Sequence, residues 1–440
     1  MQRRSVRKGG VATAAVLLIG ALAAPPPLLA QEVPEGSAPL PPVVPPAPQT
    51  TPGGIARWLN PATAPFIPIP EIDVDPQSGV TLGIIAAFLD VDSHGEIERI
   101  SAPDVFHTQY FGWGAGMSLY GFPSEDSQWQ LIGSLKQHVE HDLDVHYLAG
   151  LTRADPISWS VEALDDRSGT ARFFGIGNET PNYAESNYVD AQASLGASIG
   201  YNFTQATQLA YGARWRRVEV LPGVLTGIPS IETLYPDVNG LGTEHVFEQT
   251  FTVTHDTRDS TTIPHSGARY LLYGGFASRS FGSSVAYSFV GAAAYCYVPL
   301  GEQVTLAWHA GIRYMPSARE APFWALSSLG GDRSIVNGRE PLRSDGADRY
   351  VDENLLAIGA ELRTRVAGFD AFGTRVGLEV APFIDAGKVF SNGPGNALSE
   401  MHTALGLGVR GIASPYVVGY VDVGYGRGRG VAFSGINYAF

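Results

Sequence analysis

From about residue 77 to the end of the chain, apolar and polar residues alternate in one segment after another, with Gly, Asp, Asn or Pro turns between them. In QVTLAWHAGIRY (303–314), the residues Val, Leu, Trp, Ala, Ile and Tyr hold every second position. Gln, Thr, Ala, His, Gly and Arg hold the positions between them. LLAIGAELRTRV and RVGLEVAPFID repeat this pattern. A period of two residues indicates β-strands rather than helices.

Two classes of all-β protein show such alternation, the soluble sandwich and the transmembrane barrel. Aromatic residues near predicted strand ends, such as Tyr295, Tyr297, Trp308 and Tyr314, suit the interfacial girdle of a barrel. In a bilayer, strands must close into a ring, because an open edge would leave backbone groups unpaired. The chain also begins with the pattern of an export signal. We therefore predict an all-β, transmembrane antiparallel β-barrel of the outer-membrane type.

The alternating segments predict about sixteen strands, each near the roughly 9–11 residues that cross a bilayer at a tilt. An even number places both ends of the barrel at the periplasm, and the longest loops, 221–244 and 316–351, are then extracellular. The predicted strands are 79–92, 110–122, 128–138, 143–152, 156–178, 186–203, 205–220, 245–256, 267–280, 285–299, 303–315, 352–367, 374–390, 402–413, 416–427 and 431–440.

The segments before the predicted barrel have a different composition. Residues 1–30 combine a basic start, MQRRSVRKGG, with a short apolar run, VATAAVLLIGALAA, which is the pattern of a cleaved signal peptide. Cleavage is expected after Ala23 or Ala30. Residues 31–76 are rich in proline and predict a periplasmic linker. Within them, IARWLNPATAPFIPIPEIDV is either more linker or a short plug or strap along the wall. Residues 77–440 form the predicted barrel.

Charge and cysteine content narrow the function. The net charge of −14 argues against nucleic acid as a partner, because nucleic-acid binding calls for basic surface. Cys296 is the only cysteine, so no internal disulfide can form. Beyond the signal, no segment has the roughly 20 uninterrupted apolar residues of a spanning helix. We expect an outer-membrane protein in contact with lipid and lipopolysaccharide.

The stretch HDTRDSTTIPHSG (255–267) places charged and turn-forming residues at the end of one predicted strand and the start of the next. Arg258 lies between Asp256 and Asp259 and can pair with them locally. Pro264 presets the chain direction, and Gly267 permits a positive φ where the strand begins. The residues predict a structural turn, with contact to a periplasmic partner as the alternative.

Four motifs together resemble the bacterial surface antigen superfamily, whose best-known members are the outer-membrane assembly factors BamA and TamA. They are the D-x-R-D…P-x-x-G turn, FFGIGN (173–178), LGG (329–331) followed by a long loop and AELR (360–363), and FIDAGKVF (383–390). They occur in family order, and the resemblance spans most of 77–440. About 45 residues separate the signal from the first predicted strand, too few for a POTRA domain. The resemblance therefore implies a barrel-only member.

The resemblance also implies that the loop after LGG folds back into the lumen, where an arginine at its tip binds acids on the two following strands. Glu361 and Asp385 supply these acids, and alternation turns both inward. The family's Arg-Gly-aromatic motif is replaced by IVNGRE, with Asn337 at the position of the arginine, and Arg339 and Arg333 are the candidates to reach the acids instead. Without such a lock, both acids are ordinary lumenal charges. The other residues of these motifs are Gly330, Gly331, Asn337, Gly338 and Gly387.

One further cluster has the composition of a metal site. HVEHDLDVH (138–146) alternates His, Glu and Asp onto one face, although a charged hairpin tip explains the run equally well. No nucleophile elbow, H-E-x-x-H helix or P-loop occurs, and we expect neither an enzyme nor a cofactor.

The resemblance implies a factor for insertion, assembly or translocation of proteins at the outer membrane, through a weak seam between the first and last predicted strands. Gly435 near the middle of the last strand would weaken the pairing. The expected partners are a client outer-membrane or secreted protein and the barrel assembly machinery, which would read a C-terminal signal containing Tyr438 and Phe440. The alternative function is a passive channel or a surface-exposed structural protein.

Overall fold

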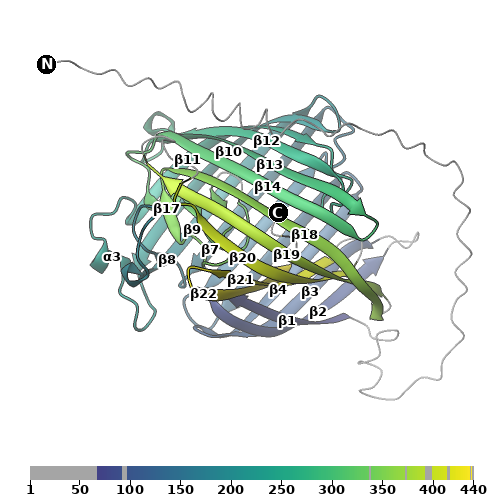
Figure 1. Cartoon of the computed structure of the whole chain (residues 1–440). Coiled ribbons are helices and arrows are strands. Elements are labelled where there is room, and N and C mark those ends of the chain that lie inside the picture. Colours follow the sequence, from purple (N-terminus) through teal and green to yellow (C-terminus); the bar gives the residue numbers. More distant parts are fainter. Residues whose placement is uncertain are drawn as a thin grey trace, which may run out of the picture. The chain divides into compact units, whose positions relative to one another are not determined.

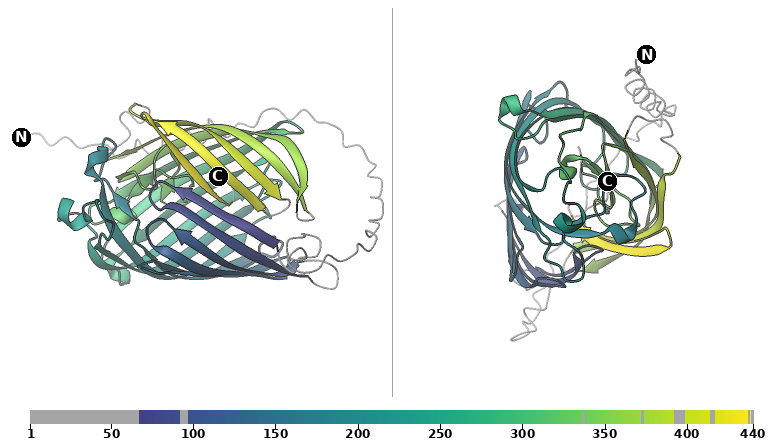
Figure 2. Two further views of the ribbon diagram at one scale, coloured as in Figure 1. Left: turned by 90° about the horizontal axis from the view of Figure 1, so that it is seen from below. Right: turned by 90° about the vertical axis from the view of Figure 1, so that its left-hand side faces the viewer.

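The computed structural model describes residues 67–91, 97–335, 338–371, 374–391, 399–413, 417–436 and 438. The predicted signal peptide, most of the predicted linker, Asn337 and Phe440 lie outside these residues. The described part consists of antiparallel strands that form a barrel, seen from the side in Figure 1 and along its axis in Figure 2. Among the described residues, no helix is long and apolar enough to cross a membrane.

Eighteen long strands follow one another around the barrel in chain order. They are β1 (Ile67–Asp75), β2 (Gly79–Val91), β3 (Ile97–Thr108), β4 (Gly112–Ser124), β5 (Ser127–Lys136), β6 (His141–Ala149), β7 (Ile157–Ser168), β9 (Ser186–Asn202), β10 (Thr207–Pro222), β11 (Gly242–Asp256), β12 (Gly267–Ala277), β13 (Tyr287–Gly301), β14 (Val304–Ser317), β18 (Asn354–Ala371), β19 (Thr374–Phe390), β20 (His402–Ala413), β21 (Val417–Gly426) and β22 (Arg429–Ile436). Each pairs antiparallel with the next.

The remaining elements lie in the connections between these strands. They are β8 (Arg172–Phe173), which pairs with the start of β9, and α3 (Ile231–Leu234), η1 (Asn182–Ala184), η2 (Arg279–Phe281), η3 (Phe323–Ala325), β15 (Ser327–Leu329), β16 (Arg339–Glu340) and β17 (Tyr350–Asp352).

The predicted fold class is confirmed, but the described part of the chain contains eighteen long barrel strands rather than about sixteen. The two missed strands are β1, which begins inside the stretch assigned to the linker, and β3. Both contain proline, and β3 is also charged, so neither has the clean alternation of the later strands. The number of long strands is still even. The two longest loops follow β10 and β14, which are the ninth and thirteenth long strands in chain order.

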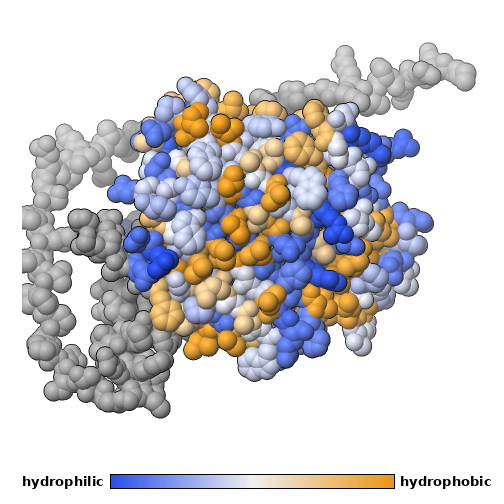
Figure 3. Space-filling model, turned by 180° about the vertical axis from the view of Figure 1, so that it is seen from behind, coloured by the Kyte–Doolittle hydropathy of each residue, from blue (hydrophilic) through white to orange (hydrophobic). Residues whose placement is uncertain are grey.

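Burial in this barrel is the inverse of burial in a soluble protein. Along β14, the inward residues Thr305, His309 and Arg313 are at most 5% exposed. Large apolar side chains such as Ile358 and Leu405 are among the exposed residues, at 47% and 60%. Figure 3 shows the apolar residues spread across the outer face. This arrangement is expected when lipid surrounds the wall and polar groups line the lumen.

Two aromatic residues are not where the girdle prediction placed them. Tyr295 and Tyr297 are 6% and 3% exposed and face the lumen, so they cannot contact the membrane interface. Alternation explains the error, since both share the inward face of β13 with buried Phe289 and Ala293. Aromatic residues are instead exposed elsewhere on the wall, at Trp113, Trp159, Tyr201, Phe203, Trp215, Phe251 and Tyr425.

The first and last described strands, β1 and β22, lie next to each other, but among the described residues no strand pairing joins them. The Ser434 hydroxyl bridges them instead, accepting from the Val74 amide at 2.8 Å and donating to the Ile72 carbonyl at 2.9 Å. The seam predicted between 79–92 and 431–440 is therefore wrong in its first member. β2 is paired on both sides, with β1 and β3, and β1 is the strand beside β22.

Candidate functional site: a loop held inside the barrel

The connection between β14 and β18 folds into the lumen, where chain segments fill the ring of strands in the end-on view of Figure 2. Its three short strands form a small sheet, with β15 parallel to β16 and antiparallel to β17. Leu329, Leu342 and Tyr350 of this loop join Leu355 and Val389 of the wall in one buried apolar cluster. Packing against the wall therefore orders the loop from β15 to β17.

Arg343 of this loop binds three carboxylates on three strands of the wall. Its Nε and Nη2 donate to the two oxygens of Asp385 on β19, at 2.9 and 2.8 Å. Nη1 donates to Glu361 on β18 at 3.1 Å and to Asp422 on β21 at 2.9 Å. The guanidinium also lies 3.5 Å from the ring centroid of Phe383. All four charged side chains are at most 1% exposed.

A second layer of arginines surrounds the same carboxylates. Arg363 donates to Glu361 through Nε at 2.6 Å, and Arg410 donates to Glu361 through Nη2 at 2.8 Å. Arg410 also lies 3.4 Å from Glu379. Three arginines thus face four acids on β18 to β21, and a buried network of this kind has little net charge.

The electrostatics of the cluster favour a charged, immobile loop arginine. Burial alone disfavours the charged guanidinium, but Asp385, Glu361 and Asp422 outweigh it and hold the pKa of Arg343 well above its ordinary value. Breaking a buried ion pair by removing one partner typically costs about 3–5 kcal/mol, because the other charge stays buried and uncompensated. The cluster can therefore act as a stable lock for the loop.

Glycines in the wall make room for the loop. A Cβ at Gly424 on β21 would clash with the backbone carbonyl of Arg343, and a Cβ at Gly426 would clash with the Ser344 side chain. A Cβ at Gly387 on β19 would overlap the Leu329 side chain. The close approach of loop and wall thus depends on small residues facing the lumen.

Glu361 and Asp385 lie where alternation predicted them, on neighbouring strands and facing the lumen. The arginine that contacts them is Arg343, whereas Arg339 and Arg333 bind elsewhere. Arg339 donates through Nε to Asp348 of the same loop at 2.7 Å. Arg333 lies over the ring of Tyr420, with Nη2 3.1 Å from its hydroxyl.

The predicted glycines of the loop have different surroundings. Gly330 and Gly331 both adopt positive φ, at 135° and 81°, where β15 ends. A Cβ at Gly330 would clash with the carbonyl of Gly346, so this glycine permits a close approach within the loop. Gly338 has open space around it. Asn337 lies outside the described residues.

Five residues of the cluster were missed from the sequence, namely Arg343, Asp422, Arg410, Arg363 and Glu379. Arg343 stands in PLRSDG, beyond the segment in which the family resemblance places its arginine. Asp422 and Arg410 did leave a signal, because each is a charge within an alternating strand, on the face opposite the apolar residues. A charged residue that faces the lumen needs a partner of opposite charge, and neighbouring strands are the nearest place for it. A search of the following strands for inward charges would have found Arg410 as a partner for Glu361, and Asp422 as a further partner for Arg410.

The FFGIGN segment also reaches across the lumen to the C-terminal strands. Asn178 accepts from the Val389 amide through Oδ1 at 3.2 Å, and its carbonyl lies 2.8 Å from Nε2 of His402. Two residues later, the Thr180 hydroxyl accepts from Arg349 of the lumenal loop at 2.8 Å. This segment therefore ties the loop between β8 and β9 to the lumenal loop and the far wall.

The D-x-R-D…P-x-x-G turn between β11 and β12 is held by its own charges. Arg258 donates to Asp256 at 2.7 and 2.9 Å. Asp259 accepts from the amides of His265 and Ser266 at 3.0 and 3.1 Å, which keeps the pKa of its carboxyl below the ordinary value despite partial burial. Gly267 has φ of 90°, next to the Thr257 carbonyl. Pro264 is buried in the turn.

Two other predicted features have distinct places. The Tyr438 ring packs on the Arg363 guanidinium, with 3.8 Å between Cζ of Arg363 and the ring centroid, so it covers one side of the ion cluster. The HVEHDLDVH run is divided between a turn and β6, and its Glu140 pairs with Lys136 and accepts from the Gly169 amide at 3.0 Å. Within the described ranges, no group of three or more His, Cys, Asp or Glu side chains is arranged to hold a metal.

Comparison with solved structures finds a similar fold with a TM-score above 0.5. BamA from Haemophilus ducreyi lacking POTRA domains 1–3 is similar over 80% of this chain and 75% of its own, with 13% identity and a TM-score of 0.51. CdiB from Escherichia coli is similar over 86% of this chain and 63% of its own, with 11% identity and a TM-score of 0.47. No curated protein matches the sequence. The profile of the Omp85 superfamily domain matches residues 143–424, and the chain therefore belongs to the Omp85 superfamily.

Proposed function

We propose that this outer-membrane protein is a non-enzymatic factor that inserts, assembles or translocates client proteins, and that it works by opening the barrel between β1 and β22. The observation that carries the proposal is the seam itself. Every other neighbouring pair of long strands is joined by a hydrogen-bonded ladder, with register shifts in four of them, whereas among the described residues β1 and β22 are joined by the hydroxyl of Ser434. Few hydrogen bonds need to break for these two strands to part.

Prolines in β1 support the same proposal. Ile72 and Val74 turn their backbone polar groups toward β22, so Pro68 and Pro70, at positions of the same parity, have that orientation too. Proline has no N–H, so this edge of β1 lacks two donors. Because Ser434 lies opposite Asp73, these two positions lie at and beyond the end of β22 at Ile436, where they limit how far the pairing can extend. A strand edge that cannot complete its ladder suits a seam that must open.

The lumenal loop supports an assembly role over a passive channel. It crosses the lumen and is locked to β18, β19 and β21 through Arg343. A barrel filled in this way obstructs steady diffusion. The loop also contacts both sides of the seam, because Asp345 pairs with Arg429 of β22 at 3.0 Å and the Ala347 carbonyl accepts from Gln77 next to β1. These contacts would have to break before β1 and β22 part. The proposed partners are a client outer-membrane or secreted protein and the surrounding lipid.

The proposal is tested by quantitative proteomics of outer membranes from a deletion strain, its parent and a complemented strain. We expect selective loss of one or a few barrel proteins or lipoproteins in the deletion strain, with recovery on complementation. An unchanged outer-membrane proteome would overturn the assembly role and favour a channel or a surface-exposed structural protein.

A further inference from the structure

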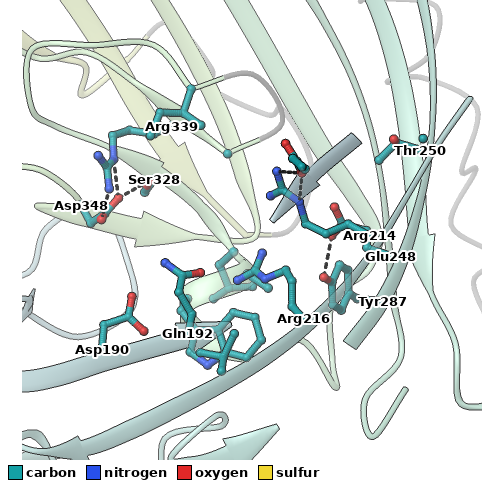
Figure 4. Close-up of a pocket in the computed structure, with 18 of the residues that line it drawn as sticks. Asp190, Gln192, Arg214, Arg216, Glu248, Thr250, Tyr287, Ser328, Arg339 and Asp348 are labelled. Atoms are coloured by element: carbon teal, nitrogen blue, oxygen red, sulfur yellow. Dashed lines mark hydrogen bonds and ion pairs between the residues drawn. The ribbon is translucent and has the colours of Figure 1, made fainter. Parts of the chain in front are cut away.

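A cavity of about 630 Å³ lies inside the barrel, between the wall and the lumenal loop. The wall side is formed by inward residues of β9, β10 and β11, and the loop side by η3 and its neighbours (Figure 4). Trp324 of η3 donates to the Gly240 carbonyl at 3.3 Å, so both long loops meet beside the cavity. Its volume is in the range of about 300–1,000 Å³ that is typical of small-molecule sites.

Most arginines around the cavity already have partners. Arg214 donates to Glu162 at 2.7 Å, Arg339 is paired with Asp348, and Arg313 donates to Ser327 at 2.9 Å. Arg214 and Arg339 are neutralised by carboxylates. Arg313 donates to the neutral oxygens of Ser327 and Ala325, while its Nε has no partner among the described residues.

Arg216 differs from these arginines. Among the described residues it has neither a hydrogen-bond acceptor nor an ion-pair partner, and its Nε is shielded from solvent. Its guanidinium is 4.9 Å from the ring centroid of Trp324. Figure 4 places Arg216 in the middle of the cavity, with Gln192 and Asp190 on one side and Tyr287 on the other. Asp190 also lines the cavity, and its Oδ1 is shielded and without a partner in the described part of the chain.

An unsatisfied buried polar group costs folding free energy, and the cost is larger for a charged group. Two half-buried side chains of opposite charge face one cavity here, and each has one shielded atom without a partner among the described residues. A ligand that offers acceptors to Arg216 and donors to Asp190 would satisfy both. The guanidinium lies over the Trp324 ring, and its fork of N–H groups matches a carboxylate or phosphate through two parallel hydrogen bonds.

We propose that this cavity binds a small hydroxylated organic anion, with its carboxylate or phosphate on Arg216 and its hydroxyl groups donating to Asp190. Sugar acids and sugar phosphates have this chemistry and fit the volume. The ligand would bridge Arg216 of β10 and the loop residue Trp324, and would therefore stabilise the lumenal loop against the wall. The proposal does not depend on the activity proposed for the seam.

The test is calorimetric titration of the purified, detergent-solubilised full chain with four probes: glucuronate, glucose 6-phosphate, glucose and acetate. We expect one saturable site for glucuronate or glucose 6-phosphate, with at least tenfold weaker binding of glucose and of acetate. Glucose lacks the anion, and acetate lacks the hydroxyl groups. Acetate binding as tightly as both hydroxylated anions would overturn the assignment of the hydroxyl groups to Asp190.

Variants locate the site. Arg216→Gln and Asp190→Asn should each weaken binding of the preferred anion at least tenfold. Arg217→Gln is the matched control, because Arg217 is the next residue on β10, is paired with Glu219 and does not line the cavity. Heat-modified gel mobility checks that each variant is folded. If a variant fails to fold, the four-probe comparison on the unaltered chain decides. Absence of saturable binding by either hydroxylated anion, or unchanged affinity in folded Arg216→Gln, would overturn the proposal.

Discussion

At the scale of single residues, Arg343 is the group on which the order of the lumenal loop depends most. It makes hydrogen bonds to three carboxylates, while its own backbone amide donates to Asp385 at 3.1 Å. No other loop arginine among the described residues reaches more than one strand of the wall in this way. Sequence alone placed the acids correctly, because alternation decides which way a strand residue points. It did not identify the arginine, because nothing in a loop's pattern specifies its path through the lumen.

Arg343→Ala should destabilise the protein by about 3–5 kcal/mol, because Asp385, Glu361 and Asp422 would keep their burial and lose their common partner. Arg333→Ala is the control, since Arg333 is half-exposed and a pair of this kind contributes no more than about 1 kcal/mol. Chemical unfolding of both variants in detergent measures the difference. Equal stability of the two variants would show that the cluster does not hold the loop.

The Arg339–Asp348 pair predicts a pH dependence within the loop. Burial would raise the pKa of Asp348, but Arg339 and the Ser328 hydroxyl outweigh it and hold this pKa below its ordinary value. A depressed folded-state pKa stabilises the fold above the unfolded pKa, near about 4, and this contribution is lost as the pH falls through the folded value.

Asp348→Asn should therefore lower the melting temperature at neutral pH and flatten its decline in acid. Asparagine tolerates the positive φ of 52° at this position, so the backbone is not the cause of any change. Melting curves of the variant and the parent between pH 3 and 7 make the comparison. Parallel curves over this range would contradict the assignment of the acid sensitivity to Asp348.

At the scale of the elements, alternation predicted β2 and the long strands from β4 onward and missed β1 and β3, where proline and charge obscure the period. Proline in β1 is informative once the structure is known, because it marks the edge that faces β22. The positions of the loop strands β15 to β17 could not be predicted, since segments of two or three residues carry no periodic signal. Their order comes from contact with the wall.

Gly424→Ala tests the fit between β21 and the lumenal loop. The added Cβ would clash with the backbone carbonyl of Arg343, and overpacking of this kind costs about 1–3 kcal/mol. Gly419→Ala on the same strand is the control, because a Cβ added there would meet no neighbouring atom within 4 Å. Limited proteolysis of the loop should be faster in Gly424→Ala alone. Equal cleavage of the two variants would mean that the loop does not depend on this contact.

Replacing Pro68 and Pro70 by threonine should strengthen the seam. Each substitution restores one N–H on the seam edge of β1, at and beyond the point where β22 ends at Ile436, so it offers the seam one further donor, and a hydrogen bond contributes about 1 kcal/mol. Ile69→Thr is the control, because the backbone groups of residue 69 turn toward β2. We expect a higher unfolding temperature on heat-modifiability gels, and lower abundance of client proteins, in the proline variant only. An unchanged unfolding temperature would mean that missing hydrogen bonds do not weaken the junction between β1 and β22.

At the scale of the whole molecule, the barrel combines an inverted distribution of polarity, a lumen occupied by its own loop and one incomplete junction in the wall. The inverted distribution of polarity follows from the sequence pattern. The loop inside the lumen was implied by the family resemblance, and it depends on residues that alternation could not identify. The incomplete junction depends on which strand comes first. The sequence pattern placed the first strand in the wrong segment, because β1 resembles part of a proline-rich linker.

The central claim is that β1 and β22 must part for the protein to act. Cysteines at Asp73 and Ser434, in a Cys296→Ser background, would link the two strands, and cysteines at Val421 and Ser434 would link β22 to its regular neighbour β21 as the control. The measurement is the abundance of client proteins in outer membranes of complemented deletion strains, with and without reductant. The account predicts loss of clients with the oxidised 73–434 link and recovery on reduction, with no loss for the control. Full client levels with the 73–434 link closed would contradict it.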